Sequence, residues 1–162
     1  NMTDVLAALS VLNGVDCMER TDALAAFHAA WRSDELVLDK WFSIQAVSPL
    51  PGTLAAVQAL TEHVDFDWKN PNRVRAVVAS FASGNQVRFH DAAGAGYRFL
   101  ADAVKRLDPI NGQVAARMVS PFGQWRRVDP GRQMRMRTEL SGILGLKDIS
   151  RGTFEMASKS LA

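Results

Sequence analysis

The sequence predicts an all-α protein, and three observations support this prediction. Apolar residues recur at spacings of three and four along most of the 162-residue chain, and these spacings place them on one face of a helix. Capping residues and Pro or Gly breakers divide the periodic segments into nine expected helices. No alternating pattern longer than a few residues indicates a strand.

The first three expected helices lie before residue 48. The first is capped by Thr3 and ends at Asn13-Gly14, because an Asn-Gly pair readily ends a helix. The second spans residues 18–31, and the third follows Ser33 with acidic residues at the positive end of its dipole. The apolar residues expected to be buried in the second and third helices are Leu24, Phe27, Trp31, Leu36, Trp41, Phe42 and Ile44.

Two further helices and a long loop follow. The Ser48–Gly52 segment is rich in proline and breaks the chain, after which Thr53 is expected to cap a fourth helix ending at Leu60. Asn70-Pro71 begins the fifth helix by combining a cap with a proline at the first position. Residues 83–96 lack periodicity and predict a loop of about a dozen residues, a length typical of functional loops.

The last four helices are expected over residues 97–107 and 111–127, from Asp129-Pro130, and from Ser150. Pro121 lies inside the 111–127 segment and predicts a kink, because its ring disturbs the carbonyl four residues earlier. Nine short helices are many for one bundle core. We therefore predict a single domain over residues 1–162, with antiparallel helix pairs stacked in an armadillo/HEAT-like superhelix.

Composition and charge narrow the function classes. A content of 48% hydrophobic and 22% charged residues is typical of globular proteins, and no uninterrupted apolar stretch predicts a membrane span. Residues 1–66 contain three basic and nine acidic residues, a net charge of −6, so the remainder carries +8. This split suggests an acidic partner or a field that steers ligands. Asp129 interrupts the basic run over residues 125–137 and Glu139 follows it, and the run lacks an aromatic ladder, so we expect no nucleic-acid partner.

The chain shows no motif for catalysis or for a cofactor. His28, His63 and His90 are isolated in the sequence and none belongs to an H-E-x-x-H helix, so we expect no metal site. The single cysteine, Cys17, excludes an intrachain disulfide and agrees with a reducing compartment. Without a signal peptide, and beginning at Asn1, the chain is expected to be cytoplasmic and to be part of something longer.

Three polar residues are candidates for ligand contact. Gln113 and Arg117 are four residues apart and share one polar edge of the 111–127 helix. Arg75 lies about 100° round the fifth helix from its apolar stripe, on a flank of small residues. From spacing alone, ordinary surface residues are the favoured interpretation and a binding role is the alternative.

Five segments, in the expected order, carry a resemblance that covers essentially the whole chain. They are D-K-W-F-S-I-Q-A-V-S-P-L-P-G-T-L (39–54), F-D-W-K-N-P-N-R-V-R-A (66–76), V-R-F-H-D-A-A-G-A-G-Y-R-F-L-A-D (87–102), D-P-I-N-G-Q-V-A-A-R-M (108–118) and S-K-S-L-A (158–162). These segments resemble the C-terminal domain of bacterial aminopeptidase N, the alanyl aminopeptidases of the zinc-dependent gluzincin class.

The resemblance implies a noncatalytic domain. In that family the zinc ligands and the glutamate base lie in a preceding thermolysin-like domain, so this chain would hold no zinc for hydrolysis and would be inactive alone. The implied partners are the catalytic domain of the same polypeptide and peptide substrates, with neither nucleic acid nor membrane. The domain would enclose an internal cavity and control peptide access, with Arg75, Gln113 and Arg117 lining it. The alternative is a free-standing helical-repeat scaffold that binds another protein.

Overall fold

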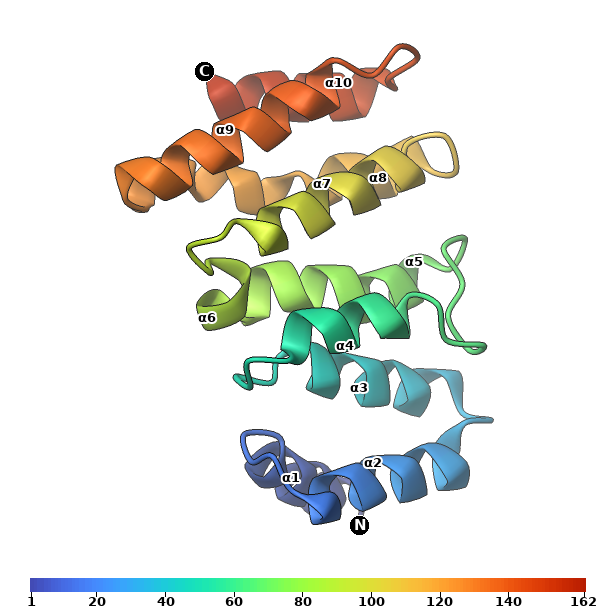
Figure 1. Cartoon of the computed structure of the whole chain (residues 1–162). Coiled ribbons are helices and arrows are strands. Elements are labelled where there is room, and N and C mark those ends of the chain that lie inside the picture. The colour runs from blue at the N-terminus through green and yellow to red at the C-terminus, as the bar shows by residue number, and fades with distance from the viewer. The chain divides into compact units, whose positions relative to one another are not determined.

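A computed structural model describes all 162 residues, and it contains helices without any strand. The prediction of an all-α protein is therefore confirmed (Figure 1). The chain divides into two compact units, the first of residues 1–66 and 72–88, the second of residues 67–71 and 89–162. No helix is both long and apolar enough to cross a bilayer. The single domain over residues 1–162 stays a prediction.

The first unit is built from successive helices that pack on their neighbours. α1 packs on α2, α2 on α3, and α3 on both α4 and the π-helix η1. Its elements are α1 (Met2–Leu12), α2 (Met18–Trp31), α3 (Glu35–Ala46), α4 (Thr53–Leu60), most of α5 (Pro71–Val74), η1 (Arg75–Gly84) and the start of α6 (Gln86–Phe89). The largest fully buried side chains of its core are Phe42, Phe81, Val57 and Val74.

The capping residues of the first unit differ in part from those expected. Asn1, rather than Thr3, caps α1, because its side chain accepts a hydrogen bond from the amide of Asp4. Asp34 caps α3, one residue after the Ser33 at which this helix was expected to start. Thr53 is the first helical residue of α4 and its hydroxyl instead donates to the Ser48 carbonyl at 2.8 Å. Two residues that we expected in the core are exposed: the exposed fraction is 41% for Trp31 and 71% for Leu36.

The fifth helix is not a regular α-helix. It begins at Pro71 as predicted, but after Val74 it widens into the π-helix η1. The buried pairs Ala76/Phe81 and Val77/Ala82 are five residues apart, which is the spacing of the i→i+5 hydrogen bonds of a π-helix. η1 packs against α3 and α4, and the spacing of its apolar residues did not predict the wider turn.

The expected loop over residues 83–96 is partly helical. Asn85 is buried, and its side-chain amide donates to the carbonyls of Ala46 at 3.0 Å and Ser48 at 2.8 Å. Its side-chain oxygen accepts the amide of Arg88, and this hydrogen bond caps the short helix α6 that begins at Gln86. The prediction of a dozen-residue loop is therefore wrong. The expected turn is confirmed at Gly94, where φ is +75°.

The second unit contains the last helices. α7 packs on α8 and α9, and α10 packs on α8, α9 and the 3₁₀-helix η2. These elements are α7 (Ala95–Leu107), α8 (Gly112–Met118), η2 (Ser120–Arg127), α9 (Pro130–Leu144) and α10 (Arg151–Leu161). Asp129 and Ser150 cap α9 and α10 through their side chains, as predicted. The disturbance expected at Pro121 appears as the change from α8 to η2.

Candidate functional site

The three candidate ligand-binding residues are divided between the two units. Gln113 and Arg117 lie one turn apart on α8 in the second unit, and both are exposed. Arg75 is the first residue of η1 in the first unit; it is exposed and donates to the side-chain oxygen of Asn72. The structure therefore brings Gln113 and Arg117 together. Whether Arg75 shares a cavity with them stays a prediction.

Arg75 lies in an open groove between α3 and η1. The groove is lined from α3 by Asp39 and Lys40 and from η1 by Arg75 and Ser80. Arg75 and Lys40 would attract an anionic group, whereas the carboxylate of Asp39 would repel it. The groove can thus receive a polar ligand of mixed charge.

The α8 candidates are positioned by a buried polar corner. Asn111 caps α8, since its side chain accepts the amide of Val114. Asp108, which ends α7, accepts hydrogen bonds from the Ser150 hydroxyl at 2.6 Å and the Ser150 amide at 2.8 Å. Burial would raise the pKa of Asp108, but the hydrogen bonds from Ser150 and Thr153 outweigh it and hold that pKa below its ordinary value. The ionised carboxylate thus ties the α7–α8 corner to the start of α10.

Arg73, which the sequence analysis did not single out, is the buried cation of the first unit. Its side chain is 2% exposed, and its guanidinium forms ion pairs with Glu35 at 2.5 Å and Asp39 at 3.2 Å. It also lies over the ring of Phe42, 4.9 Å from the centroid. Burial raises the pKa of Asp39, although the charge of Arg73 opposes the rise. The signal in the sequence was indirect, because an i,i+4 acidic pair on α3 faces this arginine.

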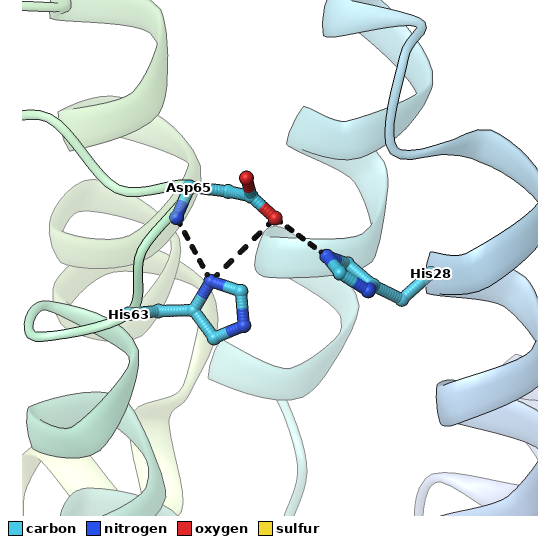
Figure 2. Close-up of side chains that lie close together, drawn as sticks. All are labelled: His28, His63 and Asp65. Carbon is cyan, nitrogen blue, oxygen red and sulfur yellow. Dashed lines mark hydrogen bonds and ion pairs between the residues drawn. The ribbon is translucent and has the colours of Figure 1, made fainter.

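Two of the three histidines meet in the first unit, although we expected all three to be isolated (Figure 2). The Nε2 atom of His28 on α2 lies 2.7 Å from Oδ2 of Asp65, in the segment after α4. The Nδ1 atom of His63 lies 3.8 Å from the same oxygen and accepts the backbone amide of Asp65 at 3.1 Å. We call His28, His63 and Asp65 the histidine cluster.

The environment of the histidine cluster sets its protonation. Burial lowers the pKa of His63, and the negative charge of Asp65 only partly opposes this. The hydrogen bond with His28 lowers the pKa of Asp65. At neutral pH the cluster therefore contains an ionised carboxylate and a neutral His63 imidazole, whose Nδ1 carries a lone pair.

The third histidine and the basic run of the second unit have structural partners. His90 Nδ1 lies 2.7 Å from the hydroxyl of Tyr97, and its carbonyl accepts from Arg132 at 2.6 Å. Arg126 and Arg137 lie over the ring of Trp125, at 4.3 and 5.2 Å from its centroid. These arginines therefore pack on the protein itself, as cation–π pairs do.

An apolar groove lies between α1 and α2 of the first unit. Its volume is about 350 Å³, and its walls include Leu9, Leu12, Phe27 and Trp31. Lining this groove explains why Trp31 is 41% exposed rather than part of the core. Exposed apolar surface of this kind marks a face suited to contact with other protein segments.

Comparison with known proteins agrees with the resemblance in the sequence. A family model described as "Domain of unknown function (DUF3458_C) ARM repeats" matches residues 1–162. The chain is 47% identical over 99% of its length to aminopeptidase N of Caulobacter vibrioides, and 38% identical over 100% of its length to aminopeptidase N of Escherichia coli. It spans only 19% of each of these two relatives.

A solved structure agrees with the fold. The crystal structure of Legionella pneumophila aminopeptidase A in complex with aspartic acid matches with a TM-score of 0.94 and 38% identity, over 99% of this chain and 19% of that one. The resemblance to a helical domain of the aminopeptidases is thus confirmed. Because the family model matches every residue, the chain belongs to the DUF3458_C family of ARM-repeat domains, which confirms the armadillo-like fold class.

Proposed function

We propose that this chain serves as the noncatalytic C-terminal helical domain of a zinc-dependent aminopeptidase N that removes N-terminal amino acids from peptides. The observation that carries the proposal is that 99–100% of the chain matches about a fifth of aminopeptidase N proteins, at 38–47% identity. The chain contains no H-E-x-x-H motif. Hydrolysis and its zinc therefore belong, in this proposal, to the catalytic domain of the same polypeptide.

The role of the domain in this proposal is to enclose the cavity over the active site and to control peptide access. Arg75, Gln113 and Arg117 would line the cavity, and all three side chains are exposed. A guanidinium can hold a peptide carboxylate through paired hydrogen bonds, and a glutamine can pair with a peptide amide. The apolar groove between α1 and α2 supports contact of this domain with another part of the polypeptide.

The encoding gene and an activity assay test the proposal first. We expect an in-frame H-E-x-x-H upstream of this chain, alanyl anilide hydrolysis by the longer polypeptide, and no hydrolysis by the 162-residue chain alone. Hydrolysis by the isolated chain would contradict the noncatalytic role. A start codon at Met2 would instead support a free-standing helical-repeat scaffold.

The cavity role is tested by Arg117→Ala in the longer polypeptide. We expect the KM for peptides to rise about tenfold or more, because a hydrogen bond to a charged group contributes about 1.5–3 kcal/mol. The KM for amino-acid anilides, which lack a distal carboxylate, should change little. Arg151→Ala is the matched control, because Arg151 is a highly exposed arginine of the same unit that pairs with Glu155. Equal effects on both substrate classes would argue against a carboxylate contact.

A further inference from the structure

We propose that His28, His63 and Asp65 form a binding site for a divalent transition-metal cation, with Zn²⁺ as the ion that their donors fit best. The three donors come from α2 and from the segment after α4, two parts of the first unit that a bound cation would join (Figure 2). Two imidazole nitrogens and one carboxylate oxygen are donors typical of Zn²⁺ sites that leave the fourth position to water.

The distances are close to those of a coordination sphere. The three ligand atoms lie within 4.8 Å of one another. Asp65 Oδ2 is 2.7 Å from His28 Nε2 and 3.8 Å from His63 Nδ1. Zinc bonds of 2.0–2.1 Å at tetrahedral angles place ligand atoms about 3.3 Å apart. Side-chain movements on the order of 1 Å would thus convert this arrangement into three zinc ligands.

The protonation states favour a cation. His63 Nδ1 accepts the Asp65 backbone amide and lies 3.8 Å from Asp65 Oδ2, so a nitrogen with a lone pair faces the Asp65 residue. Metal ligands must be deprotonated, and Nδ1 of His63 carries no proton because it is the acceptor of an amide hydrogen. Binding would replace the His28–Asp65 hydrogen bond and the amide contact to His63 with bonds to the metal.

The surroundings hold the imidazoles and leave one side open. The ring of Trp41 lies 4.6 Å from that of His28 and 5.2 Å from that of His63. Trp41 is itself fixed, because its indole donates to the Leu24 carbonyl at 2.8 Å. The side chains of His28, His63 and Asp65 are 20%, 29% and 20% exposed, so solvent can deliver an ion and supply a water ligand.

Positive charges oppose the proposed cation and provide a control. Arg32 acts electrostatically on both His63 and Asp65, and Arg73 acts on His63. Arg73 is already paired with Glu35 and Asp39, whereas Arg32 is exposed. Replacing Arg32 by glutamine should therefore tighten metal binding. A hydrogen-bonded contact between α2 and the segment after α4, without a metal, would not produce this effect.

The test is calorimetric titration of Zn²⁺ into the tag-free 162-residue chain after treatment with a chelator. We expect one equivalent to bind with a micromolar or tighter Kd, and excess Zn²⁺ to raise the Tm. His63→Ala should weaken binding at least about 100-fold, since even changes to outer-shell partners of metal ligands cost 10- to 100-fold. His90→Ala is the matched control and should bind as the unchanged chain does. Tetrahedral Co²⁺ absorption bands should appear in the unchanged chain and disappear in His63→Ala.

Two results would overturn the proposal. The first is the absence of saturable Zn²⁺ binding with a Kd below about 1 mM, a value that corresponds to a binding free energy of only about 4.1 kcal/mol. The second is equal Zn²⁺ affinity in the unchanged chain and in His63→Ala. Circular dichroism checks that each variant folds. If His63→Ala is unfolded, Asp65→Asn supplies the same comparison, because it keeps the side-chain size and removes the charged ligand. Unchanged affinity in a folded Asp65→Asn would also refute the site.

Discussion

Replacing Asp108 by alanine should loosen the second unit at the corner that positions α8. Asp108 is 7% exposed and follows the last residue of α7. Its two carboxylate oxygens accept the amide of Ser150 at 2.8 Å and its hydroxyl at 2.6 Å. Ser150 also caps α10 through the amide of Thr153. One carboxylate therefore connects the end of α7 to the start of α10.

The expected loss in the free energy of unfolding follows from these two hydrogen bonds. A hydrogen bond to a charged group contributes about 1.5–3 kcal/mol, and an unpaired buried donor adds a desolvation cost. Because the Ser150 hydroxyl can turn to Thr153, we take the lower end of the range for each bond and expect a loss of about 3 kcal/mol. For a protein of this size that corresponds to a fall in Tm of roughly 6–12 °C.

The assay is urea denaturation of the 162-residue chain, with hydrogen exchange of the α10 amides as the local measurement. Because its native pKa is lowered, Asp108 stabilises the fold above its unfolded pKa of about 3.9. That contribution is lost as the pH falls through the lower native pKa. The difference between the unchanged chain and Asp108→Ala should therefore shrink below about pH 4. Asp102→Ala is the control, because its side chain is 66% exposed. A loss below about 0.5 kcal/mol, typical of surface substitutions, would refute the reasoning.

Two further substitutions test the packing of each unit by urea denaturation. Gly96→Ala should lower the free energy of unfolding by about 2–3 kcal/mol, because a Cβ at this position would lie 2.5 Å from the Phe89 backbone oxygen. Gly52→Ala is the control: a Cβ there meets no atom within 4 Å, so this variant should be as stable as the unchanged chain. Equal stability of the two variants would contradict the close approach of Gly96 to Phe89. Arg73→Met should lower the free energy of unfolding by about 3 kcal/mol, since removing the buried guanidinium leaves Asp39 without its nearest counter-charge. Arg75 is exposed, so Arg75→Met is the control and should change that free energy by less than about 0.5 kcal/mol. A neutral Arg73→Met would show that this ion pair contributes nothing.

Local signals in the sequence predicted most of the helices. Asp34, Asp129 and Ser150 cap helices in the structure, because capping depends only on residues within one turn. The π-helix η1 could not be predicted in this way. Its wider turn depends on how Phe81 and its neighbours pack on α3 and α4, which the spacing within one segment does not report.

The buried polar contacts depend on chain segments that are distant in sequence. Asn85 lies 39 residues from Ala46, yet their hydrogen bond helps to fix a segment that we predicted to be a loop. The histidine cluster joins residues 28 and 65 across two intervening helices. A His-x-Asp spacing at residues 63–65 was visible, but without the packing of α2 nothing indicated a second histidine beside it.

The division into units makes Arg75 and Arg117 unequal candidates for a carboxylate. The first unit contains six basic and nine acidic residues, a net charge of −3, and the second contains thirteen and eight, a net charge of +5. Arg75 lies in the acidic unit, in a groove lined by Asp39; burial raises the pKa of Asp39, and the charges of Arg73 and Arg75 only partly oppose this rise. Arg117 lies in the basic unit, one turn from the neutral Gln113. Since a nearby carboxylate offsets the attraction of a guanidinium for an anion, the electrostatics favour Arg117 as the residue that would meet a peptide's carboxylate.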